Sequence, residues 1–282
     1  MKKYYLILLC LFISNHIFAQ KLNDIQNISL IAPNGIKIDG KSIEWNDLYA
    51  ADNKRTELFY TMANDDKNLY LVMKSASNTN TNKIMLGGIT FTINAQGKKR
   101  EKEGVSITYP LINRSNRNQS GRAGQGQNRQ GMQGGFQNRN QQNNPQRDSI
   151  ALVNKKAQLA TVREIKVAGF KNITDTLISI YNEFGIKAVA NIDQKGNYIY
   201  EVAIPLNMIE FTEKKDFVYQ IKVNGMSNMN FGGNGGGNGG FGGGGGNFGG
   251  GARLNGGNGG GNNTQDLMSP TDFWGKYTLA KP

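Results

Sequence analysis

The clearest alternation of apolar and polar side chains lies between residues 58 and 73. Every second residue is bulky and apolar on both sides of a polar turn at 64–68: Leu58, Tyr60, Met62, Leu69, Leu71 and Met73. A period of two is typical of strands with one buried face. The stretch therefore predicts a β-hairpin.

The same period, or a short β-rich run, recurs along most of the chain. Further strands are predicted over 83–93, 105–111, 164–170, 176–181, 186–192, 198–204, 217–223 and 271–279. The paired glycines Gly87 and Gly88 indicate a bulge or a close backbone approach within the first of these strands. The pattern predicts an all-β protein, a jelly-roll-like β-sandwich of about ten strands with one or two short helices.

One segment has a helical period instead. After a potential cap at Asp148 and Ser149, apolar residues recur at helical spacing: Ile150, Val153, Ala157 and Ala160. We expect these residues to face the protein body, and Lys155, Lys156 and Arg163 to face water.

Two low-complexity inserts interrupt the predicted strands. Residues 114–147 hold sixteen Asn or Gln, six Arg and no acidic residue, and residues 231–263 hold twenty of the 37 glycines. Neither insert has enough apolar residues to form a core, so we expect both to be disordered loops. The six arginines are a large part of the net charge of +12, so the rest of the chain is only mildly basic.

The first residues have the layout of a secretory signal peptide. Lys2 and Lys3 precede an apolar run over 4–13, and Ala19 precedes Gln20. We expect residues 1–19 to be removed and residues 20–282 to form a single exported domain without a transmembrane segment, located in the periplasm, on the outer surface or outside the cell.

Cleavage would remove Cys10 and His16, the only cysteine and the only histidine of the chain. Without them there is no disulfide, no Ser-His or Cys-His pair, and no zinc site with nitrogen and sulfur ligands. No catalytic motif is recognisable, so we expect a binding protein and no enzyme.

Two motifs resemble family 9 carbohydrate-binding modules. The first runs from Ile38-Asp39-Gly40 through Glu44-Trp45 and the Asp65-Asp66 turn to Leu69-Tyr70-Leu71, and the second is the strand 201–205, EVAIP. The resemblance implies a β-sandwich that binds carbohydrate. Relatives in that family also bind calcium, so the resemblance implies that a structural calcium ion is an option.

The candidate ligand-binding residues are Trp274, Tyr60, Tyr109 and Glu201. Aromatic rings can stack on the C–H faces of sugars, and a carboxylate can accept hydrogen bonds from sugar hydroxyls. Glu201 has an alternative structural role within the EVAIP strand. We interpret Trp45, the other tryptophan, as a core residue and not as a sugar platform.

Asp65 and Asp66 are the candidate metal ligands, because calcium prefers carboxylate and carbonyl oxygens. Turn formation explains the two residues more simply. The acid-rich spacing of a calcium loop is missing, and no other cofactor is expected.

The leading hypothesis is an exported, non-catalytic protein that binds carbohydrate and is linked to polysaccharide recognition or breakdown. The first alternative is a surface or matrix adhesion protein that contacts its partners through the Arg-rich and Gly-rich inserts. The Arg-rich insert would bind anionic glycans or lipopolysaccharide. Export argues against nucleic acid as a partner. The second alternative is a glycan hydrolase that uses two carboxylates, drawn from Glu44, Asp47, Glu57, Glu201 and Glu210.

Overall fold

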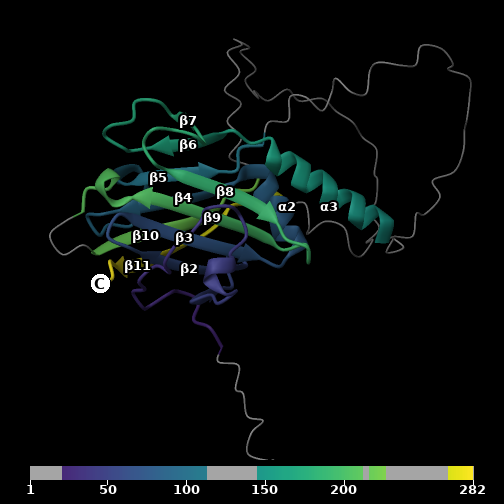
Figure 1. Cartoon of the computed structure of the whole chain (residues 1–282), viewed down its shortest axis with the longest axis horizontal. Coiled ribbons are helices and arrows are strands. Elements are labelled where there is room, and N and C mark those ends of the chain that lie inside the picture. Colours follow the sequence, from purple (N-terminus) through teal and green to yellow (C-terminus); the bar gives the residue numbers. More distant parts are fainter. Residues whose placement is uncertain (1–20, 113–144, 212–215, 227–265, 282) are drawn as a thin grey trace, which may run out of the picture.

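The chain folds into two antiparallel β-sheets that lie face to face. The computed structural model describes residues 21–112, 145–211, 216–226 and 266–281. Five strands form one sheet in the order β1-β2-β3-β9-β8, and six form the other in the order β11-β10-β4-β5-β6-β7. Figure 1 shows the two sheets with the helices α2 and α3 at one end. The predicted β-sandwich is confirmed.

The predicted hairpin is the centre of the five-stranded sheet. β2 (Leu58–Asn64) pairs with β3 (Asn68–Ser75), and their inward side chains are fully buried. Asp65 closes the turn, because its Oδ1 accepts the N–H groups of Lys67 and Asn68 at 2.8 and 2.6 Å. β1 (Ala51–Asn53) extends the sheet on one side, and β9 (Tyr198–Pro205) and β8 (Lys187–Ile192) extend it on the other.

The six-stranded sheet is built from the later strands together with two early ones. Its members are β4 (Ile89–Asn94), β5 (Val105–Tyr109), β6 (Glu164–Ala168), β7 (Leu177–Ser179), β10 (Asp216–Val223) and β11 (Thr271–Thr278). All neighbouring pairs run antiparallel. The prediction of a final strand near residue 271 is confirmed.

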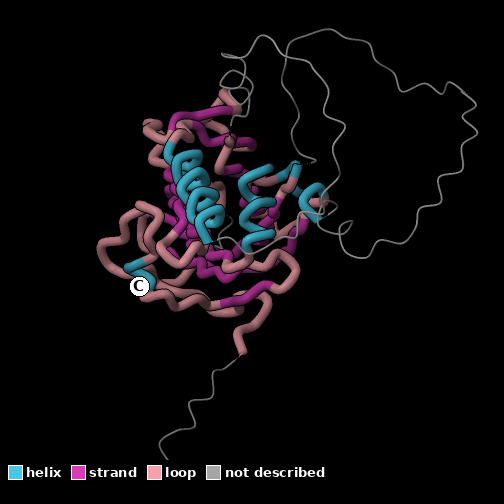
Figure 2. The backbone as a smooth tube through the Cα atoms, turned by 90° about the vertical axis from the view of Figure 1, so that its right-hand side faces the viewer, coloured by secondary structure: helices cyan, strands magenta, loops and turns pink. Residues whose placement is uncertain are grey.

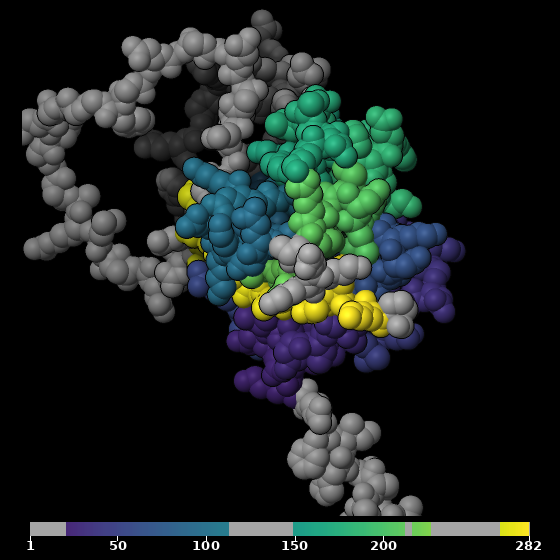
Figure 3. Space-filling view, turned by 90° about the vertical axis from the view of Figure 1, so that its left-hand side faces the viewer, coloured from purple at the N-terminus to yellow at the C-terminus, as the bar shows by residue number. Residues whose placement is uncertain are grey.

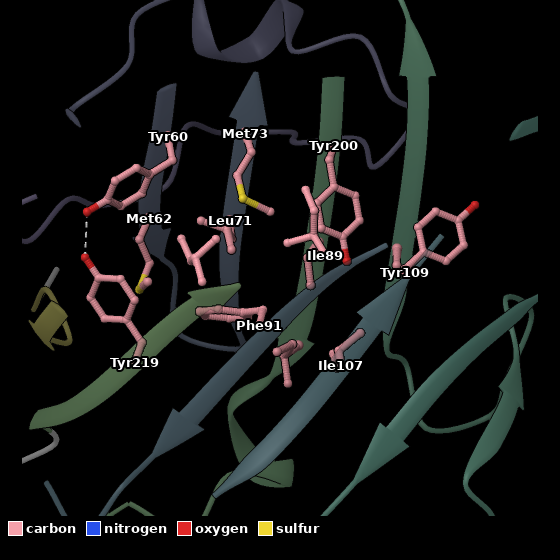
Figure 4. Close-up of a cluster of buried hydrophobic side chains, with 14 of the residues drawn as sticks. Tyr60, Met62, Leu71, Met73, Ile89, Phe91, Ile107, Tyr109, Tyr200 and Tyr219 are labelled. Carbon is pink, nitrogen blue, oxygen red and sulfur yellow. Dashed lines mark hydrogen bonds between the residues drawn. The ribbon is translucent and has the colours of Figure 1, made fainter. Parts of the chain in front are cut away.

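Large apolar side chains from both sheets fill the space between them (Figure 4). Tyr109 of β5 stacks on Tyr200 of β9 with ring centroids 5.9 Å apart. The hydroxyl groups of Tyr60 and Tyr219 are hydrogen-bonded to each other at 2.8 Å across the two sheets. This bond lets two tyrosines be buried without leaving either hydroxyl unpaired.

The strand predicted over 83–93 is wrong in its first half. Residues Asn78–Gly87 form helix α2, which begins where the side chain of Ser77 accepts the N–H of Asn80 at 3.2 Å. Gly88 ends the helix with φ 73°, a conformation that glycine adopts without strain. The two glycines therefore mark the turn from the helix into β4 and not a bulge. The close backbone approach is confirmed, because a Cβ atom at Gly87 would lie 1.8 Å from the carbonyl oxygen of Gly225.

The helix predicted after residue 148 exists, but its orientation is opposite to the expected one. Helix α3 spans Pro145–Ala160, with Leu152 and Leu159 packed against the core. Ile150 and Val153 are 57% and 63% exposed. Lys155 instead faces α2, where its Nζ donates to Asn78 at 2.6 Å. Figure 2 shows α2 and α3 side by side over one end of the sandwich.

An N-terminal segment joins the edges of the two sheets. The side chain of Gln26 pairs with the backbone of Met62 in β2, donating to its C=O at 2.8 Å and accepting its N–H at 2.7 Å. Four residues later, the N–H of Leu30 donates to the hydroxyl of Tyr277 in β11, and this hydroxyl donates to the C=O of Leu30. Figure 3 shows this purple segment directly against the yellow C-terminal strand.

We predict that Gln26→Ala lowers the free energy of unfolding by ~1–3 kcal/mol, because it leaves buried backbone groups of Met62 without partners. Urea unfolding of the full chain would measure the loss. Gln158→Ala is the matched control, since the Gln158 side chain makes no hydrogen bond within the described residues. Equal stabilities of the two variants would contradict the role of Gln26.

Several predicted segments lie outside the described residues: the signal peptide 1–19, residues 114–144 of the first insert and the whole insert 231–263. Residues 145–147 of the first insert belong to α3. In the described part of the chain, no helix is both long enough and apolar enough to span a bilayer.

Candidate ligand-binding pocket

The outer face of the five-stranded sheet is covered by residues 30–49. A small second core lies beneath them: Ala32, Trp45, Ala63, Tyr70, Val72 and Ala203. Trp45 is 6% exposed, so its interpretation as a core residue is confirmed. It belongs to η2 (Ile43–Trp45), a single 3-10 turn that closes this cover. In Figure 1 the purple segment crosses over the sheet.

Glu201 fixes this cover to the sheet. Its side chain points outward from β9, and one oxygen, Oε2, accepts the N–H groups of Asp39 and Gly40 at 3.0 and 2.7 Å. The other oxygen, Oε1, is buried and has no hydrogen-bond partner within the described residues. The two motifs singled out in the sequence, Ile38-Asp39-Gly40 and EVAIP, thus meet at one carboxylate.

Burial raises the pKa of Glu201 above its usual value of 4.5. The N–H groups of Gly40 and Asp39 lower the pKa, and the charges of Asp39 and Glu44 raise it again, so the net shift is upward. The folded protein therefore binds this proton more tightly than the unfolded chain does.

Gly40 lets the loop approach β8 closely. A Cβ atom at this position would lie 2.8 Å from the Cβ of Asn191 and 3.3 Å from a methyl group of Val189. Gly40 also has φ 79°, which disfavours other residues. The Asp39-Gly40 turn therefore lies between Glu201 and the end of β8.

The loop that follows has an unusual backbone. Ser42, Asn46 and Asp47 have φ values of 33°, 50° and 55°, in the left-handed region. Asn and Asp adopt this region more readily than other residues, but three such residues in six positions indicate a backbone held by its surroundings. Backbone of this kind is concentrated at binding and catalytic sites.

A pocket of about 580 Å³ opens between this loop, the β8–β9 turn and α3. It is lined by residues 40–43, 46–47 and 191–194, together with Lys156 and Ile199. Its volume lies within the range of about 300–1,000 Å³ that is typical of small-molecule sites. The wall formed by the loop includes Ile43, which is 70% exposed.

The polar groups of this pocket are mostly amides and balanced charges. Asn46, Asn191 and Gln194 contribute amide side chains, which both donate and accept hydrogen bonds. The two lysines and two aspartates of the lining sum to zero formal charge. Lys41 forms an ion pair with Asp39 at 3.5 Å, and Asp47 forms one with Lys74 at 3.4 Å. Asp193 holds the β8–β9 turn by accepting the N–H and Nδ2 of Asn197 at 2.8 and 2.7 Å. Such a lining suits a neutral ligand with several hydroxyl groups.

The structure places two of the four candidate residues in the main core. Tyr60 is fully buried and Tyr109 is 3% exposed, and both rings lie between the sheets (Figure 4). Their rings therefore present no outer face on which a sugar could stack. Alternation along a strand separates its two faces, but it could not identify which face points inward, because the strands of both sheets have the same period of two.

Glu201 is also buried, at 1% exposed, but it supports the pocket through Gly40. We therefore assign it as a positioning residue. Trp274 lies elsewhere, on the outer face of β11 opposite Gln220 of β10, and is partly exposed. It does not line the pocket, and its role in ligand binding remains a prediction.

The Asp65 side chain is occupied by the turn, since Oδ2 also accepts the hydroxyl of Tyr70 at 2.8 Å. Burial raises the pKa of Asp65, but the hydrogen bonds from Asn68, Lys67 and Tyr70 together lower the pKa by more, so the net shift is downward. In the described residues there is no cluster of three or more acidic, histidine or cysteine side chains that could hold a metal ion.

Sequence reasoning missed the polar lining of the pocket. Asn46, Asn191, Gln194 and Lys156 come from three separate elements, and no motif connects them. The one usable signal was Asn46-Asp47 directly after Trp45, because a pair of such residues after a short helix favours a left-handed turn.

A comparison of the chain with protein-family models finds no match, and a comparison with curated proteins also finds none.

Proposed function

We propose that this protein is exported and binds neutral saccharides in the pocket between residues 40–47, the β8–β9 turn and α3, without catalysing a reaction. The observation that carries the proposal is the pocket itself, with amide side chains on its walls and an exposed isoleucine beside them. Amides match sugar hydroxyls, and an aliphatic side chain matches the C–H groups of a sugar ring.

Two further observations support this assignment. Glu201 holds the Asp39-Gly40 turn at the start of the pocket wall, so this part of the wall is formed before a ligand arrives. Preformed walls reduce the conformational entropy that the protein must lose on binding. The residues that resemble family 9 carbohydrate-binding modules, Asp39-Gly40 and Glu201, build this wall and its support.

The test uses calorimetric titration of the full chain with neutral oligosaccharides, namely cellohexaose, xylohexaose, mannohexaose and laminarihexaose. We predict that Ile43→Ser weakens the binding of the preferred sugar by about tenfold, which corresponds to ~1.4 kcal/mol. Ile28→Ser is the matched control, because Ile28 is 52% exposed and lies outside the pocket.

Absence of binding to every sugar by a folded protein would overturn the proposal. Deleting residues 114–144 tests whether binding resides in the Arg-rich insert. We expect sugar binding to survive that deletion, and its disappearance would favour adhesion through the insert.

A further inference from the structure

A second, smaller pocket lies at the opposite end of β9. The first pocket is lined by the turn 191–194 and Ile199, at the start of β9, and the second by residues 207–210, after the strand ends at Pro205. An eight-residue strand spans about 25 Å. The two pockets therefore cannot be parts of one continuous site.

Three loops meet at this second pocket, which has a volume of about 170 Å³. They are residues 95–104 between β4 and β5, residues 169–172 after β6, and residues 207–210 after β9. Loops carried on a rigid sandwich are common places for binding sites.

Two glycines let the backbones of these loops pack closely beside the pocket. A Cβ atom at Gly169 would lie 2.3 Å from the carbonyl oxygen of Gly104, and one at Gly104 would lie 2.5 Å from that of Ile93. Gly169 also has φ 80°. The backbones can approach this closely only without side chains, and the pocket opens beside them.

Each of the three loops contributes one amide side chain: Gln96, Asn172 and Asn207. All three residues are exposed, and their side chains make no hydrogen bond to any described part of the protein. Three amides with unused donors and acceptors thus converge on one pocket.

The charged groups around the pocket are already paired. Lys171 forms an ion pair with Glu210, and Glu103 accepts from Arg100 at 2.7 Å. The polar groups left for a ligand are therefore neutral, and the side chains of Ala95 and Met208 add apolar surface. This combination suits an uncharged molecule with several hydroxyl groups.

We infer that this second pocket binds one ring of a neutral saccharide, so that a single molecule holds two sugar chains at opposite ends. The choice of ligand class rests on the proposed function of the first pocket. The volume of 170 Å³ lies below the range of about 300–1,000 Å³ that is typical of small-molecule sites, so the pocket admits no more than a single ring or a chain end. Two separate sites allow the protein to bridge polysaccharide chains.

The experiment measures binding stoichiometry in the full chain by calorimetry, with the preferred hexasaccharide of the panel above. We expect two sugars per protein in the wild type and one in the double variant Asn172→Ala/Asn207→Ala. Asn154→Ala/Gln158→Ala on α3 is the matched control and should retain two. Light scattering with the parent polysaccharide should show bridging that the Asn172→Ala/Asn207→Ala variant loses.

The outcomes separate the two proposals. One sugar per wild-type molecule, weakened by Ile43→Ser and unaffected by Asn172→Ala/Asn207→Ala, overturns the second site and leaves the first. Two sugars with no effect of Asn172→Ala/Asn207→Ala also overturns it. One sugar whose binding depends only on Asn172 and Asn207 overturns the first pocket and the bridging together. No binding overturns both.

Discussion

Replacing Glu201 by alanine is expected to loosen the cover of the five-stranded sheet and to weaken ligand binding in the first pocket. The N–H groups of Asp39 and Gly40 would lose their acceptor in a buried place, at a cost of ~1–3 kcal/mol each. Removal of the buried carboxylate offsets part of this cost, so we expect a net loss of about 2 kcal/mol in the free energy of unfolding. Urea unfolding and calorimetric titration would measure the two effects.

Glu201→Gln separates the hydrogen bonds from the charge. The amide oxygen can still accept the two N–H groups, so this variant should be at least as stable as the wild type and should keep its ligand affinity. Loss of stability in Glu201→Gln as large as in Glu201→Ala would contradict the role of the hydrogen bonds.

A comparison of the wild type with Glu201→Gln also gives a test of the pH dependence of stability. Because the pKa of Glu201 is raised in the folded state, its contribution to stability is fully present below the usual value of 4.5. The contribution is lost as the pH rises through the folded-state pKa. The wild type should therefore lose stability relative to Glu201→Gln as the pH is raised above 4.5, and a constant difference would contradict the raised pKa.

The second large effect is expected at Tyr60. Its ring is fully buried, and the ring centroid lies 5.2 Å from that of Phe273. Its hydroxyl is hydrogen-bonded to the hydroxyl of Tyr219 and accepts the N–H of Gln26. Tyr60→Ala should cost ~3–5 kcal/mol, because it removes a large core side chain. Chemical unfolding of the full chain would measure the loss.

Tyr60→Phe keeps the ring and removes only the hydroxyl, so it should cost ~1–3 kcal/mol by leaving the Tyr219 hydroxyl and the N–H of Gln26 short of a partner. Tyr181→Phe should change stability by less than ~0.5 kcal/mol, because Tyr181 is 81% exposed. If Tyr60→Phe lowered sugar affinity at unchanged stability, Tyr60 would be a ligand-binding residue and not a core residue.

The architecture could be predicted from the sequence because strands alternate in side-chain type, and over 164–168 and 187–192 this alternation follows burial directly. The pattern could not distinguish a helix from a strand where either element would bury the same residues. Ile84 and Met85 are buried in α2 as they would be in a strand, and only the cap at Ser77 reveals the helix. On α3 the spacing of Ile150 and Val153 was correct, but the side that faces the body is decided by Leu152 and Leu159.

The candidate pockets could be predicted much less well. Glu201 was recognised, but its contact with Asp39 and Gly40 joins residues more than 160 positions apart. The amides that line both pockets come from loops whose positions depend on sheet order. A single sequence contains no local pattern for a contact of that kind.

The pairing of Leu30 with Tyr277 spans 247 positions and has a consequence for synthesis. Until the ribosome has made β11, the segment around Leu30 has no partner in the six-stranded sheet, and the edge that β11 covers on β10 stays open. Contacts this distant slow folding, because a long loop must close first. The two sheets of the nascent chain should therefore close into a complete sandwich only after β11 has been made.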